Sequence, residues 1–275
     1  VHLLSLPAYR RVALRGLSVS AGGITESTLR GARGALNQHL AHASRLEIEL
    51  VGEDLISLIL EHSKEARLAL PLLRMTEQLL EARVLETLLH RYTREQVDSA
   101  KGCSAPFAQR LHEAMRTAVP SSAKDMSALM AALTMEVLLL PYAQGRFLAD
   151  LFRAVLLTLG HRYPKLRKAA ADQLYIHLLT YGDPAAMSAD DGEGGGEGER
   201  LAPDGPERLD ECLRLLTETA WLADLDEQAR PARARMFELF KLRPPQVAAA
   251  NPIARPSVSK EDDDSYAALV GEMGY

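Results

Sequence analysis

The chain has 275 residues, of which 47% are hydrophobic and only 5% aromatic, a composition that favours leucine- and alanine-packed helices over a β-sandwich. Residues 1–182 carry 22 Lys and Arg against 17 Asp and Glu, whereas residues 183–275 carry 10 against 20. The basic excess of the first part is too small and dispersed for nucleic-acid binding but suits an acidic protein partner. Two distant cysteines and no apolar run of roughly 20 residues give no support to a disulfide framework, a zinc site or a membrane span.

The first predicted unit is a helical hairpin. Residues 9–18 form a short helix with Val12, Leu14 and Leu17 as expected inward positions, and the two glycines at 22–23 end it. Thr25 stands where an N-cap hydroxyl is expected, and the next helix runs to about residue 42. Because the chain begins with Val1 and shows no signal-peptide pattern, we expect a cytoplasmic piece of a longer polypeptide.

Two further helical pairs follow, at residues 50–81 and 106–140. Pro71 falls within the second helix of the first pair, where it either occupies the first turn or kinks the helix. Ser122 and Asp125 have the spacing of a capping box before the last of these helices. Residues 84–102 are less periodic, although residues 93–96 also resemble a capping box.

Residues 146–180 show the most regular pair. Pro164 suits a first helical turn, and from there Leu166, Ala170, Leu174 and Leu178 recur every four residues, so one face is buried. The order of proline turn, Leu-Arg and alanine resembles the second helix of a HEAT repeat. Such a pair needs neighbours on both sides, so the sequence predicts an all-α solenoid of HEAT/armadillo-like helical hairpins.

The predicted domain organisation has four parts. Residues 1–182 form helical repeats, and residues 183–206 form a disordered, acidic, glycine-rich insertion with almost no apolar side chain. Residues 207–242 are expected to form the closing pair of the same solenoid, and residues 243–275 a flexible, proline-rich and acidic tail.

Several segments resemble the C-terminal domain of tubulin-folding cofactor D. The segment at 9–28 combines a hydrophobic helix, a Gly-Gly turn and a Thr-Glu start, and it is joined by segments at 70–73, 161–169, 175–181 and 217–221. The resemblance covers about Leu6 to Pro245. The chain departs from the family in its long insertion, in residues 84–105 and in the tail after Asn251.

The resemblance implies a chaperone that captures β-tubulin and assembles it with α-tubulin. It also implies that the chaperone acts together with tubulin cofactors C and E, and that release is linked to GTP hydrolysis by tubulin. Further implications are association with an Arf-like small GTPase and with the cytoskeleton. Two other readings remain: a HEAT scaffold that binds another cargo or a small GTPase, and a regulator of GTP turnover without an active site of its own.

The residues give no support to catalysis, a metal or a cofactor. The glycine run at 192–198 has no following Gly-Lys-Ser/Thr, and the histidines form no H-E-x-x-H motif. The candidate partner contacts are Arg162, Lys165 and Lys168, of which the two lysines share one helix face. Arg167 is expected to point elsewhere and to pair with an acid of the adjoining repeat, and His177 to be a partly buried, hydrogen-bonded core residue.

Overall fold

The structure, a computed structural model, describes residues 2–21, 26–89, 105–120, 123–183 and 206–243. All described residues belong to one compact unit, Val1–Pro244, which is the first of the two parts into which the chain divides. Every regular element in these ranges is helical, which confirms the all-α prediction. Thr25, the capping box at 93–96, the glycine run at 192–198 and nearly all of the predicted insertion and tail lie outside the described residues.

The elements, in chain order, are η1 (His2–Ser5), α1 (Pro7–Ala21), α2 (Glu26–Ala41), α3 (Arg45–Glu61), α4 (Ala66–Glu81), α5 (Glu86–Leu89), α7 (Phe107–Ala118), α8 (Met126–Leu139), η2 (Leu140–Tyr142), α9 (Gly145–Thr158), α10 (Pro164–Tyr181), α12 (Pro206–Glu218), η3 (Leu225–Ala229) and α13 (Arg230–Leu239). No helix among them is long and apolar enough to cross a membrane.

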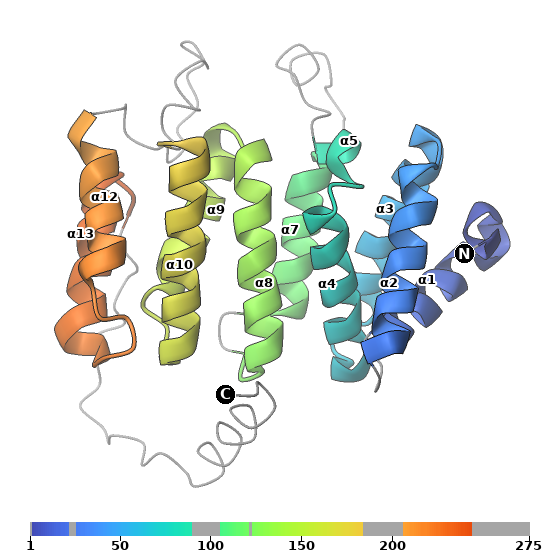
Figure 1. Cartoon of the computed structure of the whole chain (residues 1–275), viewed down its shortest axis with the longest axis horizontal. Coiled ribbons are helices and arrows are strands. Elements are labelled where there is room, and N and C mark those ends of the chain that lie inside the picture. The colour runs from blue at the N-terminus through green and yellow to red at the C-terminus, as the bar shows by residue number, and fades with distance from the viewer. Residues whose placement is uncertain (1, 22–25, 90–104, 121–122, 184–205, 244–275) are drawn as a thin grey trace, which may run out of the picture. The chain divides into compact units, whose positions relative to one another are not determined.

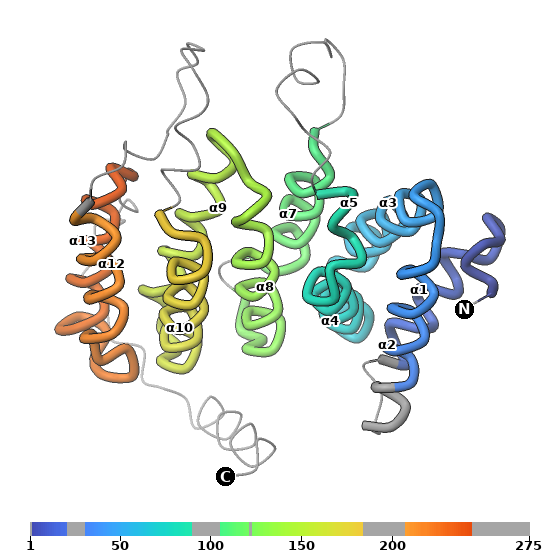
Figure 2. The backbone as a smooth tube through the Cα atoms, turned by 45° about the horizontal axis from the view of Figure 1, so that its top comes forward, coloured from blue at the N-terminus to red at the C-terminus, as the bar shows by residue number. Residues whose placement is uncertain are grey.

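The helices of the first unit pack in two rows. In one row α4 packs on α8, α8 on α10 and α10 on α12, as Figure 1 shows. In the second row α3 packs on α7 and α9 on α13. At the blue end of the tube in Figure 2, α1 contacts α2, α3 and α4. Each helix therefore buries one face against a neighbour in its own row and another against the facing row.

The central helix α8 contacts four other helices, α4, α7, α9 and α10. Its buried side chains cover one side of the helix, and the apolar side chains of Met130 and Val137 on the other side are half-buried. The helix is therefore apolar nearly all round, whereas a typical surface helix has a polar face. A buried Glu136 lies near His112 and Arg116, with carboxylate–nitrogen distances of 3.6 and 3.5 Å.

Local signals explain several helix starts. Ser44 accepts a hydrogen bond from the backbone N–H of Glu47 and starts α3 five residues before Leu50, earlier than periodicity predicts. The Asp125 carboxylate accepts from two backbone N–H groups, so Asp125 is itself the N-cap of α8, and Ser122, the other member of the predicted capping box, lies outside the described residues. Pro71 lies inside α4, beyond its first turn.

The last two helices meet the preceding pair in reversed order. The first of them, α12, packs on α10, which is the second helix of its own pair, and α13 packs on α9. Asp183, just after α10, contacts Arg208 near the start of α12, while Arg167 near the start of α10 contacts the loop after α12. Helices α10 and α12 are therefore antiparallel, and polar contacts join them at both ends.

Candidate protein-partner surface

The outer face of α10 carries the two predicted lysine contacts. Leu166, Ala170, Leu174 and Leu178 are buried, as the four-residue spacing predicts. The opposite side of the helix presents Lys165, which is half-buried, and Lys168, which is exposed. Asp172, Ile176 and Leu179 follow on the same side at intervals of three and four residues. We call these five residues the α10 stripe.

The charge of the α10 stripe is smaller than its lysines suggest. The Lys168 ammonium lies 2.5 Å from the Asp172 carboxylate, one helical turn further along. An exposed pair at this spacing contributes only about 0.3–0.5 kcal/mol, so a partner's carboxylate can exchange with Asp172 at little cost. The N-terminal end of the stripe therefore carries only a small positive charge.

Ile176 and Leu179 give the stripe an apolar end. They are 61% and 58% exposed and lie about one helical turn apart, so two large aliphatic side chains stand together on the outer face. They were not predicted from the sequence, because the four-residue spacing that ends at Leu178 identifies only the buried face of the helix. The signal was present: a second series of positions runs from Lys165 through Asp172 to Leu179 on the outer face.

Arg162 lies just before α10 and is held by the neighbouring ring. Its guanidinium carbon stands 4.5 Å from the centre of the Tyr163 ring, and it donates a 2.6 Å hydrogen bond to the Tyr163 hydroxyl. The side chain remains exposed. The structure therefore places all three predicted contacts at the N-terminal half of α10 and around its start.

Arg167 has a structural role instead. It is only 2% exposed, and it donates to the backbone carbonyl oxygens of Trp221 at 2.9 Å and Ala223 at 2.5 Å. The third guanidinium nitrogen, Nη1, donates to the carbonyl oxygens of His161 and Arg162. The expectation that Arg167 reaches the adjoining pair is correct, but the groups it meets there are carbonyl oxygens of the loop after α12. A guanidinium with several fixed donors suits such a cluster of acceptors.

A second buried contact joins the other end of α10 to α12. The Arg208 Nε donates a 2.7 Å hydrogen bond to the Asp183 carboxylate, its Nη2 lies 2.6 Å from the same carboxylate oxygen, and both side chains are buried. Burial raises the pKa of the neighbouring Cys212 thiol to about 12, so this cysteine is not a nucleophile at neutral pH. Cys103 lies outside the described residues.

His177 is buried beneath the α10 stripe. It is 4% exposed, and its ring lies 4.9 Å from the ring of Tyr181. Burial lowers the pKa of His177 to about 4, so the imidazole is neutral at physiological pH. This agrees with the predicted core role, with deeper burial than expected.

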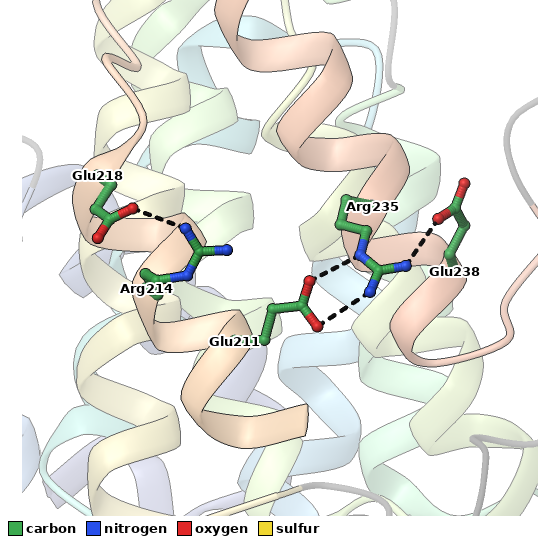
Figure 3. A network of polar contacts seen from close by, with 5 residues as sticks. All are labelled: Glu211, Arg214, Glu218, Arg235 and Glu238. Carbon is green, nitrogen blue, oxygen red and sulfur yellow. Dashed lines mark hydrogen bonds and ion pairs between the residues drawn. The ribbon is translucent and has the colours of Figure 1, made fainter. Parts of the chain in front are cut away.

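The outward side of α12 and α13 carries a network of ion pairs. Glu211 accepts hydrogen bonds of 2.8 and 3.1 Å from two nitrogens of Arg235, which also donates to Glu238, and Arg214 pairs with Glu218 (Figure 3). The hydrogen bond from Arg235 lowers the pKa of Glu211. Charges of both signs offset each other here, so this surface has no strong preference for either sign of partner.

The remaining polar features do not suggest a catalytic centre. A cleft of about 220 Å³ is lined by two arginines and two glutamates, Arg33, Arg74, Glu77 and Glu81, together with Gln78. Burial and the nearby Glu81 carboxylate raise the pKa of Glu77. Within the described ranges, no group of three or more His, Cys, Asp or Glu side chains could hold a metal ion.

The described residues thus define a class: an all-α protein whose helices pack side by side in two rows and which exposes charged and apolar side chains along α10. Residues 1–127 match the family model described as "Tubulin folding cofactor D C terminal". This match confirms the resemblance over residues 1–127, and the resembling segments from residue 161 onward lie beyond it. The α10 stripe lies beyond the matched residues. No solved structure matches the chain.

Proposed function

We propose that the chain acts as a β-tubulin-binding chaperone segment in the post-chaperonin folding and assembly of the α/β-tubulin heterodimer. The observation that carries the proposal is the family match over residues 1–127. The two rows of packed helices support the finer reading of the fold as a HEAT/armadillo-like solenoid, an architecture that offers extended surfaces to protein partners.

The proposed contact surface is the α10 stripe together with Arg162. Lys165 and Lys168 face an acidic region of the client, and Ile176 and Leu179 supply the apolar contact that charges alone do not provide. The chain works without a cofactor or an active site of its own. Cofactors C and E and an Arf-like small GTPase are the further proposed partners, in the cytoplasm and at the cytoskeleton.

Charge reversal tests the contact surface directly. The double variant K165E/K168E is expected to weaken binding of purified β-tubulin by at least about ten-fold and to reduce the salt dependence of the affinity. The matched control is K64E/K124E, which reverses two other exposed lysines and makes the same change in net charge. Equal losses in both double variants would show that only overall charge matters.

Competition and enzymology separate the proposed function from the other readings. An unrelated acidic protein should not displace β-tubulin from the chain, whereas a general scaffold for acidic cargo would release it. If the chain stimulates GTP hydrolysis by tubulin together with cofactors C and E, single-turnover hydrolysis will be faster with the chain than without it. Unchanged rates would remove the GTPase role while leaving the chaperone role in place.

A further inference from the structure

A cleft between α2 and α4 holds charged side chains that the fold does not pair. Arg33 of α2 lines this α2–α4 cleft together with Arg74, Glu77, Gln78 and Glu81 of α4, a helix that α2 contacts. Burial, and after it the Glu81 carboxylate, raises the pKa of Glu77, and the two arginines are close enough to act in the opposite direction. Yet none of the four charged side chains forms an ion pair within the described part of the chain. Two cations and two anions therefore surround one space without pairing.

Ion pairs do form between the same kinds of side chain elsewhere on the helices. On α13, Arg235 lies 3.1 Å from Glu238, three residues further along the helix (Figure 3). Arg74 and Glu77 have the same order and spacing on α4, a spacing at which opposite charges are neighbours, but they do not pair. The α2–α4 cleft thus keeps its charges available to groups from outside the described fold.

Two buried polar atoms of the cleft residues also lack a hydrogen-bond partner among the described residues. They are the Nε of Arg33, which is a donor, and the side-chain oxygen of Gln78, which is an acceptor. A buried polar atom without a hydrogen bond costs about 1–3 kcal/mol, so folded proteins leave few such atoms unsatisfied. A ligand that both accepts and donates hydrogen bonds would satisfy the two atoms at once. The two atoms therefore indicate a bound group independently of the charges.

The size and lining of the cleft favour the side chains of a protein over a free small molecule. Its volume of about 220 Å³ equals the space of about seven water molecules and lies below the roughly 300–1,000 Å³ of most small-molecule pockets. Such pockets are lined mainly by apolar and aromatic side chains, whereas all five residues here carry a charge or an amide. A small molecule would gain little apolar contact, but a protein adds contacts on the surface around the cleft.

The order of the charges along α4 sets the arrangement of the partner. Arg74 precedes Glu77 by three residues and Glu81 by seven, which corresponds to about 4.5 and 10.5 Å along the helix axis. A basic group midway between the two glutamates would therefore lie about 7.5 Å from an acidic group at the arginine. Two side chains one turn apart on a helix have a similar separation, of roughly 6 Å.

We propose that the α2–α4 cleft receives two opposite charges from a helix of a partner protein, with an acidic side chain at the two arginines and a basic side chain at the two glutamates. The partner's carboxylate accepts a hydrogen bond from the Arg33 Nε–H, and its basic group donates one to the Gln78 oxygen. A partner surface of one sign fits less well, because half of the cleft would repel it. The cleft lies within the residues matched by the family model, apart from α10, and its occupation does not depend on β-tubulin binding.

The test measures binding of the whole chain to a labelled helical peptide by fluorescence anisotropy. The peptide has about 20 residues, mostly alanine and glutamine, with one Glu and one Lys four residues apart. Peptides with two Glu, two Lys or two Gln at the same positions are the controls, and we expect them to bind at least about ten-fold more weakly. The Nε–Hε resonance of Arg33, assigned by its absence in R33K, should shift in NMR spectra as the Glu/Lys peptide saturates the chain.

Charge reversal should change which peptide binds. R33E/R74E makes the cleft wholly acidic and should favour the two-Lys peptide, whereas E77K/E81K makes it wholly basic and should favour the two-Glu peptide. E81K alone alters an exposed side chain and should weaken binding of the Glu/Lys peptide several-fold without lowering the melting temperature. The control E227K makes the same change at an exposed glutamate outside the cleft and should leave the affinity unchanged. If thermal melts show that a double variant does not fold, the comparison of E81K with E227K still decides.

Three kinds of result would overturn the proposal. The first is no saturable binding of the Glu/Lys peptide, or equal binding of the two-Gln peptide, which would show that the cleft does not recognise a pair of charges. The second is binding that E81K does not weaken or that leaves the Arg33 resonance in place, which would locate the peptide elsewhere. The third is another occupant: free glycine that shifts the resonance at the same concentration as the peptide, or dimerisation in sedimentation velocity that E81K abolishes.

Discussion

Replacing Arg167 by methionine tests whether one buried arginine holds the last two helices on the preceding pair. Methionine keeps most of the apolar volume of the side chain but removes the donors to Trp221 and Ala223. A net contribution of about 1.5–3 kcal/mol for each hydrogen bond from a charged group puts these two contacts at about 3–6 kcal/mol. Release of the guanidinium from its buried site offsets part of this, so we expect R167M to lower the free energy of unfolding by about 3 kcal/mol.

Urea denaturation followed by circular dichroism gives this free energy, and hydrogen–deuterium exchange locates the change. Amides of residues 206–243 should exchange faster in R167M, while those of α3 and α4 should change little. R167K, which keeps the charge but loses the planar fork of donors, should fall between wild type and R167M. The control is R162M at an exposed arginine, with an expected cost below about 1 kcal/mol. Equal costs for R162M and R167M would refute the reasoning.

Burial lowers the pKa of His177 to about 4, so below about pH 6.5 the unfolded chain binds a proton that the folded chain does not. Stability therefore decreases as the pH is lowered from about 6.5 to about 4, by up to about 3 kcal/mol. H177L should remove this part of the pH dependence, and an unchanged slope in urea titrations would contradict it. D183N leaves the Arg208 charge without its carboxylate and should cost about 3 kcal/mol, whereas D183L/R208M should recover most of that loss. A double variant as unstable as D183N would show that packing, not charge, is responsible. E211Q removes an exposed partner of Arg235 and should leave the melting temperature almost unchanged at physiological salt; a clear drop would mean that the network stabilises the last pair more than surface ion pairs normally do.

Most of the helices could be predicted from periodicity because their buried faces recur at short range. Pro164 begins α10 as expected, and Leu166, Ala170 and Leu174 are buried. The prediction failed at Val12, because an apolar residue on a helix does not reveal which side a neighbouring helix covers. Its exposure depends on contacts of α1 with α2 and also with α3 and α4, which are more distant in sequence.

The candidate surface was predictable only in part, for a similar physical reason. The shared face of Lys165 and Lys168 follows from helix geometry, and the structure agrees. The role of Arg167 could not be derived, because two of its acceptors, the carbonyl oxygens of Trp221 and Ala223, belong to a loop more than 50 residues away. The reversed order of α12 and α13 also depends on which row α12 joins, and local periodicity carries no such information.

The antiparallel contact of α10 and α12 places few demands on the length of the connection between them. Since the side chains of Asp183 and Arg208 are in contact, the C-terminal end of α10 and the N-terminal end of α12 lie close together, and closing a loop between neighbouring ends costs little more as the loop lengthens. Residues can therefore be removed or added there, down to a short hairpin turn or up to an entire inserted reporter domain, without altering how the helices meet. The part of the sequence between Asp183 and Arg208 is therefore a suitable place to insert a fluorescent protein and to follow the chain in cells.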